Sequence, residues 1–227
     1  MNSFGDAELE RSIDAAIRRT IDRFRPLHPR HKWYAMTKVR LDPCYRAVAR
    51  LVPPGTLTVD LGSGIGILAA VLAELGEGRR VHGIEHDARK HSASLKATSG
   101  LAAVRMVEGD IHSLPIPGCQ VVTLIDVLHC FEPGRQAALL RRVADSLDSK
   151  GLLLVRETDA GRAGGARFTR AFERMAITIG WNQNAKTHFR SRAEWMAELA
   201  AAGLRASASD VSNRMNPGNL LLVAQKA

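Results

Sequence analysis

The chain of 227 residues is long enough to bury a sizeable core, and 45% of its residues are hydrophobic, which excludes an intrinsically disordered polypeptide. Cys44, Cys119 and Cys130 form no CxxC pair, so the sequence indicates neither a disulfide framework nor a zinc site, and we expect no bound metal. The net charge of +9 would suit an anionic partner, but the basic residues are spread along the chain, so nucleic acid is a weak expectation that is not excluded.

The first ten residues contain three carboxylates and no apolar core, so no secretory signal is predicted there. The longest apolar stretch, 57–76, includes Asp60 and Glu74, which argues against a membrane span. These features predict a cytoplasmic protein.

Residues 1–54 are expected to form an N-terminal helical extension or cap. Apolar residues recur at helical spacing after Asp6, the expected N-cap, and Pro26 ends this helix. The segment 32–43 is ambiguous. Asp42 and Pro43 then predict an N-cap and a first helical residue for a helix over 43–52.

The pattern after residue 55 alternates short apolar runs with helical segments, which indicates a parallel sheet with helices on both faces. The expected strands are 56–61, 81–85, 104–108, 120–125, 151–156, 205–211 and 219–225. The expected helices are 65–75, 87–97, 133–147, 166–179 and one that opens at a capping box of Ser191 and Glu194.

A glycine-rich loop, "TVDLGSGIGIL" at 58–68, follows the first strand, where ligands bind in doubly wound sheets. Its order is D-x-G-x-G-x-G, which differs from the G-x-G-x-x-G of dinucleotide-binding proteins. Asp60 would repel a pyrophosphate and suits a cationic or hydrogen-bond-donating ligand instead. Glu85 ends the second strand, where a carboxylate can accept ribose hydroxyls, and Asp110 ends the third, where it can accept from an exocyclic amine.

Four motifs in order, "VDLGSGIG", "GIEHD", "EGDI" and "IDVLH", resemble those of class I S-adenosylmethionine-dependent methyltransferases over about 56–227. The resemblance implies an α/β, doubly wound, seven-stranded sheet, mostly parallel with an antiparallel last strand, and a cofactor-binding methyltransferase domain over 55–227. It implies S-adenosyl-L-methionine as cofactor and S-adenosyl-L-homocysteine as product. The implied contacts are Gly62, Gly64 and Gly66 with the methionine part, Glu85 with the ribose, Asp110 with the adenine, His86 and Ile111 on either side of the ring, and Asp126, with Asp60, toward the cationic amino-acid end.

Two histidines are candidate general bases for deprotonating a substrate hydroxyl. His129 lies at the mouth of the fourth strand, and His188 follows the helix expected over the pocket. A structural role remains the alternative for each of them.

The segment 158–190 is a lid-like insert, whose Phe168, Phe172 and Trp181 would line an apolar substrate pocket or pack in the core. In the segment 32–43, Tyr34 and Arg40 would reach the methionine carboxylate or the substrate, or form a solvated basic face. The N/D-P-P-aromatic motif of nucleic-acid amino methyltransferases is missing at 126–129, which favours a small-molecule substrate.

The sequence therefore predicts a methyltransferase acting on a small aromatic or hydroxylated molecule of specialised metabolism. "KVRLDP" at 38–43 also resembles, faintly, a segment of aryl-polyene-associated methyltransferases. An RNA methyltransferase and a non-catalytic cofactor-binding or assembly protein are the alternatives, and a homodimer is left open.

Overall fold

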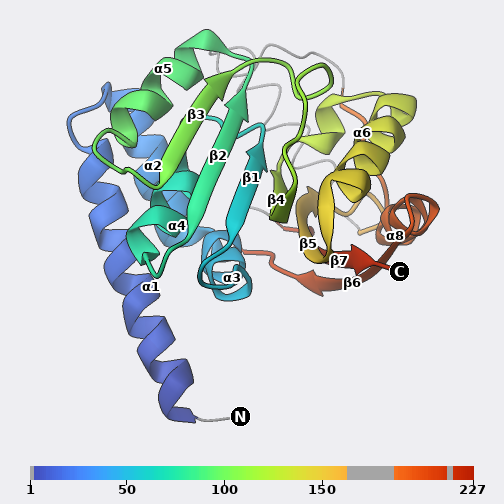
Figure 1. The fold of residues 1–227 in the computed structure, drawn as a ribbon, viewed down its shortest axis with the longest axis horizontal. Coiled ribbons are helices and arrows are strands. Elements are labelled where there is room, and N and C mark those ends of the chain that lie inside the picture. Colours follow the sequence, from blue (N-terminus) through green and yellow to red (C-terminus); the bar gives the residue numbers. More distant parts are fainter. Residues whose placement is uncertain (1–2, 163–186, 214–216) are drawn as a thin grey trace. The chain divides into compact units, whose positions relative to one another are not determined.

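The computed structural model describes residues 3–162, 187–213 and 217–227 of the chain (Figure 1). The chain divides into two compact units, 1–121 and 122–227, and we describe each by itself. The strands form one seven-stranded sheet in the order β3-β2-β1-β4-β5-β7-β6, which confirms the predicted fold class. The strands are β1 (Leu57–Leu61), β2 (Arg80–Glu85), β3 (Val104–Glu108), β4 (Cys119–Ile125), β5 (Leu147–Thr158), β6 (Leu204–Asp210) and β7 (Asn219–Lys226).

The described pairs of strands are parallel within the first unit and antiparallel within the second. In the first unit, β1 pairs in parallel with β2, and β2 pairs in parallel with β3. In the second unit, β7 runs antiparallel to both β5 and β6. Parallel strands bring their carboxyl ends to one edge of the sheet, so the loops after β1, β2 and β3 start from the same edge.

Three helices open the chain: α1 (Ser3–Phe24), α2 (Pro29–Leu41) and α3 (Pro43–Leu51). The cap predicted at Asp6 is wrong, because α1 begins at Ser3 and Asp6 lies in its first turn. A carboxylate in the first turn of a helix is stabilised by the positive end of the helix dipole. The ambiguous segment is α2, which has Pro29 at its start and His28 as its cap. The predicted cap of α3 is confirmed, since the Asp42 carboxylate accepts a hydrogen bond from the Cys44 N–H at 3.0 Å.

Helix α1 packs on α4 (Ile67–Leu75), the helix that follows the glycine loop. The Arg19 and Arg23 guanidinium groups of α1 both pair with the Glu74 carboxylate of α4. The buried face of α1 consists of Ile13, Ala16, Ile17, Ile21 and Phe24. Residues 1–54 therefore belong to the same compact unit as β1, β2 and β3, and the domain boundary expected at 54/55 stays a prediction.

Helix α5 (Ala88–Ala97) begins after β2 and is capped by Asp87. One carboxylate oxygen of Asp87 accepts hydrogen bonds from the backbone N–H groups of Arg89 and Lys90, at 2.9 and 3.3 Å. The Arg89 guanidinium also donates to this carboxylate, and together these bonds hold the pKa of Asp87 well below its ordinary value.

We expect Asp87→Ala to lower the free energy of unfolding at pH 7 by about 1 kcal/mol, because it removes the cap of α5. The folded-state pKa of Asp87 lies below the ordinary value of 3.8, so this stabilisation is complete above about pH 4 and is lost as the pH falls through the folded-state pKa. Urea unfolding of the wild-type and variant chains at pH 7 and in acid measures the difference. Asp87→Ser is the control, because it keeps a capping oxygen and should lose less than the alanine variant.

The described part of the second unit contains the 3₁₀ turn η1 (Leu128–Cys130), followed by α6 (Pro133–Ser146) and later α8 (Arg192–Ala201). The predicted capping box is confirmed, because the Ser191 N–H donates to the Glu194 carboxylate at 2.7 Å and the Ser191 side chain accepts from the Glu194 N–H. The strand expected over 151–156 is longer, since β5 begins at Leu147, directly after α6. The helix expected over 166–179 lies outside the described residues. Among the helices that the structure describes, none has the length and apolar composition needed to span a bilayer.

Candidate functional site

The glycine loop after β1 is held in a conformation that favours glycine. Gly62, Gly64 and Gly66 have φ values of +73°, +57° and +81°, all in the left-handed region. The N–H groups of Gly62 and Ser63 donate to the Ile84 carbonyl of β2, at 2.8 and 3.0 Å. The backbone at these three positions therefore favours glycine, and the loop is bonded to the neighbouring strand.

Glu85, the last residue of β2, joins several predicted site residues. One oxygen of its buried carboxylate accepts from the Gly64 N–H at 2.8 Å, and the other accepts from the Asp87 N–H at 2.8 Å. The second oxygen also lies 3.2 Å from Nδ1 of His86. The structure thus brings Glu85, Gly64 and His86 together within the first unit.

The charges of this group follow from its contacts. Burial would raise the pKa of Glu85, but hydrogen bonds from His86 and from the Asp87 N–H outweigh it and hold the pKa below the ordinary value. The hydrogen bond to Glu85 raises the pKa of His86. Glu85 is therefore an ionised acceptor at neutral pH, as the binding of ribose hydroxyls requires.

The space available for a side chain differs between two glycines of the loop. An ideal Cβ at Gly64 would meet no atom of the described chain within 4 Å, whereas a Cβ at Gly66 would lie 3.0 Å from the Ser94 Cβ. Gly66 therefore serves the close approach of α5, while Gly64 borders open space beside the Glu85 carboxylate. A ribose-containing ligand fits this combination of open space and ionised acceptor.

The other predicted cofactor residues of the first unit occupy separate places. Asp60 is 3% exposed, within β1. Asp110 is exposed after β3, and its carboxylate accepts from the His112 N–H at 2.9 Å. Ile111 is buried and His86 is exposed, so their expected positions on either side of an adenine ring stay a prediction.

In the second unit, Asp126 directly follows β4 and has a φ of +61°. Its N–H donates to the Arg156 carbonyl of β5 at 3.0 Å, and its carboxylate pairs with the Arg156 guanidinium. Arg156 is only 2% exposed. A left-handed conformation costs a non-glycine residue roughly 1–3 kcal/mol, so β5 holds Asp126 in a strained position of the kind found at functional sites.

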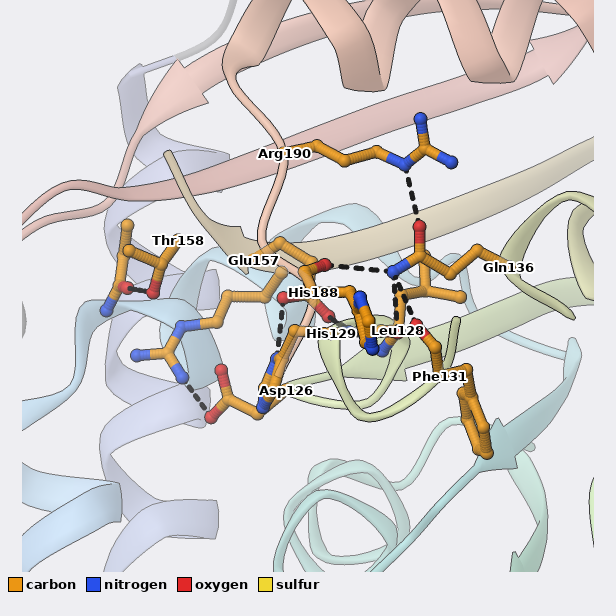
Figure 2. A network of polar contacts seen from close by, with 11 residues as sticks. Asp126, Leu128, His129, Phe131, Gln136, Glu157, Thr158, His188 and Arg190 are labelled. Atoms are coloured by element: carbon orange, nitrogen blue, oxygen red, sulfur yellow. Dashed lines mark hydrogen bonds and ion pairs between the residues drawn. The ribbon is translucent and has the colours of Figure 1, made fainter. Parts of the chain in front are cut away.

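His129, in the turn η1, has a carboxylate partner that the sequence did not reveal (Figure 2). Its Nδ1 lies 2.7 Å from Oε2 of Glu157, which is fully buried in β5. The other Glu157 oxygen accepts from the Leu128 N–H at 2.7 Å and from the His129 N–H at 3.3 Å. A carboxylate at Glu157 can accept a hydrogen bond from Nδ1–H, and in that tautomer the ring lone pair lies on Nε2.

Glu157 belongs to a run of three buried polar residues at the end of β5. Arg156 bonds to Asp126, Glu157 to the turn at His129, and Thr158 to Asn219 of β7, with 3.1 Å between Oγ1 and Oδ1 (Figure 2). All three are less than 5% exposed. The sequence "RET" directly after the apolar "LLLV" could have indicated this group of buried polar contacts, because consecutive polar residues at the end of a buried strand need hydrogen-bond partners.

His188 lies beside His129, since its N–H donates to the His129 carbonyl at 2.7 Å. The ring of Phe189 stacks on the His129 ring, with 4.9 Å between centroids and 26° between planes. The bonds found for His188 use its backbone, whereas His129 has an ionisable side-chain partner. The structure thus distinguishes the two histidines.

The structure describes only two of the residues that were predicted to contact the substrate. Tyr34 is half-buried and Arg40 is exposed, both on α2. Phe168, Phe172, Trp181 and most of the insert 158–190 lie outside the described residues. Within 3–162, 187–213 and 217–227, no group of three or more His, Cys, Asp or Glu side chains is arranged to hold a metal ion.

A family model described as a methyltransferase domain matches residues 58–151, which run from β1 through the glycine loop, Glu85, Asp126 and His129 into β5. Over these residues the chain resembles class I S-adenosylmethionine-dependent methyltransferase domains. The four motifs and the strand order agree with that resemblance.

Several known proteins are similar to this chain, and the similarity covers only part of each of them. Acetylserotonin O-methyltransferase of Mus musculus is 31% identical over 156 residues, which cover 66% of this chain and 39% of the mouse protein. The structure of human N-acetylserotonin methyltransferase with S-adenosylmethionine has a TM-score of 0.64 and 21% identity, and covers 86% of this chain and 54% of that one.

A third relative is an O-methyltransferase from neocarzinostatin biosynthesis, solved with S-adenosylmethionine and 2-hydroxy-5-methyl naphthoic acid. It has a TM-score of 0.62 and 24% identity, and the match covers 86% of this chain and 56% of that one. The chain therefore spans between 39% and 56% of the length of these relatives.

Proposed function

We propose that the chain is an S-adenosylmethionine-dependent methyltransferase that transfers a methyl group to a hydroxyl oxygen of a small aromatic molecule. The contact between His129 Nδ1 and Glu157 Oε2, at 2.7 Å, carries this proposal. A histidine fixed in this way is suited to take a proton from a hydroxyl group, which an oxygen acceptor requires. The names of the O-methyltransferase relatives support the same substrate class.

The first unit would hold the cofactor. Glu85 is an ionised acceptor for the ribose hydroxyls, and Gly64 leaves open space beside it for the rest of the molecule. When bound, S-adenosylmethionine supplies a methyl group that its sulfonium has already activated. Asp60, in the same unit, carries a carboxylate that suits a cationic group of this cofactor, whereas the Asp126 carboxylate of the second unit is paired with Arg156.

His129 would act on the acceptor. The hydroxyl proton moves to Nε2, the acceptor oxygen forms its bond to the methyl carbon as the bond from carbon to sulfur breaks, and the imidazolium later releases the proton to water. Glu157 stabilises the imidazolium through its hydrogen bond to Nδ1. Since the methyl group is already activated, the protein contributes mainly positioning and this proton transfer.

We expect Glu85→Ala to weaken binding of S-adenosylmethionine by about 10- to 100-fold, which corresponds to loss of charge-assisted hydrogen bonds worth about 1.5–3 kcal/mol. The same change removes the bond to the Gly64 N–H and should lower the melting temperature as well. Isothermal titration and thermal unfolding measure the two effects. Glu108→Ala, on the neighbouring strand β3, is the matched control, and equal affinity of both variants would contradict a role for Glu85 in the cofactor site.

The proposed reaction can be tested with phenolic probes. The full chain is incubated with methyl-labelled S-adenosylmethionine and either 2-hydroxy-5-methyl naphthoic acid or N-acetylserotonin, and O-methylated products are identified by mass spectrometry. Phenols that lack these substituents extend the panel. Cofactor binding without transfer to any hydroxyl in the panel would contradict the proposal and favour the non-catalytic alternative.

The RNA methyltransferase alternative predicts a different result. Protein that contacts several phosphates loses affinity steeply as salt rises. Filter binding of a single-stranded RNA at about 50 and 200 mM salt separates the two functions. We expect at most weak binding of the RNA at about 50 mM salt and no labelled methyl group in it, whereas tight binding together with a labelled RNA would favour the RNA methyltransferase.

A further inference from the structure

Gln136, in the first turn of α6, is a fully buried side chain with four polar contacts (Figure 2). Its Nε2 lies 3.0 Å from each of the carbonyl oxygens of Leu128, Phe131 and His188. Its Oε1 accepts from Nε of Arg190 at 2.6 Å. One amide therefore joins the turn that carries His129 to the segment 187–190.

The chemistry of these partners fixes how the amide points. The three carbonyls can only accept hydrogen bonds, and a guanidinium can only donate them. A flipped amide would place its oxygen against three carbonyl oxygens and its NH₂ against Arg190. Glutamine suits both sides, with its two N–H bonds shared among the three carbonyls, whereas a carboxylate of the same shape suits only the Arg190 side.

Arg190 is itself anchored on α8. Its guanidinium pairs with the Glu198 carboxylate at 3.0 Å and lies 5.6 Å from the ring centre of Trp195. Trp195 is fully buried in the second unit. The contact between Gln136 and Arg190 thus connects the His129 turn to a rigid helix.

Phe189 is held between two fixed neighbours. On one side, the His188 N–H donates to the His129 carbonyl at 2.7 Å and the His188 carbonyl accepts from Gln136. On the other side, Arg190 donates to Gln136. These bonds keep the Phe189 ring stacked on the His129 ring, at 4.9 Å between centroids.

We propose that Gln136 is a positioning residue, which fastens the segment 187–190 to the turn 128–131 so that Phe189 stays stacked on the ring of His129. Phe189 on one face and Glu157 at Nδ1 then leave the ring a single orientation, with Nε2 held in one direction. The effect of this orientation on turnover rests on the proposed function, but the stacking itself does not.

Nuclear magnetic resonance of the full chain without ligand tests the stacking. A ring proton of His129, assigned by its disappearance in His129→Ala, should be shifted upfield by the ring current of Phe189. We expect Gln136→Met and Phe189→Leu each to remove this shift, and Arg141→Gln, at an exposed position of α6, to leave it unchanged. An unchanged shift in Gln136→Met would overturn the proposal.

Gln136→Glu and Arg190→Met separate the two sides of the amide. Gln136→Glu keeps an acceptor for Arg190 but sets an oxygen against the three carbonyls, so we expect it to lose the shift as fully as Gln136→Met. Arg190→Met keeps the carbonyl bonds but takes the donor from the Gln136 Oε1 and the partner from the Glu198 carboxylate, so it should lower the melting temperature and lose only part of the shift. Loss of the shift in Arg190→Met alone, with Gln136→Glu unaffected, would contradict the assigned roles.

Turnover on the best phenolic probe completes the test. We expect Gln136→Met to lower kcat by about tenfold while the cofactor Kd stays within twofold of wild type. A lost shift with unchanged kcat would overturn the positioning role. If the wild-type chain methylates no probe, the proposed function fails, and the resonance measurements still decide whether Gln136 holds Phe189 on His129.

Discussion

His129→Ala is expected to lower kcat by about a hundredfold or more, with the cofactor Kd unchanged. Deprotonating a phenol with a pKa near 10 at neutral pH requires about 4 kcal/mol, so a base held beside the acceptor hydroxyl should contribute strongly to the rate. Stopped assays on the best phenolic probe, with isothermal titration of S-adenosylmethionine, measure the two quantities separately.

His188→Ala is the matched control, because the bonds that tie His188 to its neighbours come from its backbone and survive the change. The sequence left the choice between these two histidines open, and the Glu157 partner favours His129. Glu157→Gln should also lower kcat, since an amide stabilises the imidazolium less than a carboxylate. Wild-type rates for His129→Ala between pH 6 and 9 would contradict a general base and leave positioning alone as the source of catalysis.

Gly64→Val is expected to weaken binding of S-adenosylmethionine beyond detection. The φ of +57° is strained for a β-branched residue, and the new side chain would enter the open space beside Glu85 where the ligand is proposed to lie. Isothermal titration measures the affinity and thermal unfolding measures the stability. Normal affinity in this variant would mean that the loop does not contact the ligand.

Gly66→Val is the comparison variant, and we expect it to affect folding stability more than Gly64→Val does. A Cβ at Gly66 would lie 3.0 Å from the Ser94 Cβ, so its damage should fall on the packing of α5 and lower the melting temperature more than Gly64→Val does. Gly64→Ala is the milder variant, because the left-handed conformation alone costs an alanine about 1–2 kcal/mol.

Local chemistry made much of the fold predictable. Asp42 followed by Pro43, and Ser191 followed by Glu194, marked helix starts because their side chains bond to nearby backbone N–H groups, and both caps are present. The strands β1 and β4 lie within one residue of the expected ones, because their mostly buried residues read as apolar runs. Asp6 failed as a cap because α1 extends one turn beyond its apolar stripe.

The site was less predictable where its residues meet only after folding. Glu157 and His129 are 28 residues apart, and Gln136 and Arg190 are 54 apart, so no local spacing connects them. Glu85 and the glycine loop could be placed from the sequence, because each directly follows or ends a strand in the expected order of elements. The partners of His129 depended on which side chains β5 and the segment 187–190 bring to the turn.

The packing of α1 on α4 limits which segments can be exchanged between this chain and a similar one. Arg19 and Arg23 share Glu74, and the buried face of α1 covers the helix that leaves the glycine loop. A fragment that begins at residue 55 would expose this apolar surface and leave Glu74 without its two cations. The N-terminal helix and the glycine-loop helix should therefore be inherited as a matched pair, and a chimera that exchanges one without the other should be poorly folded even with every cofactor residue intact.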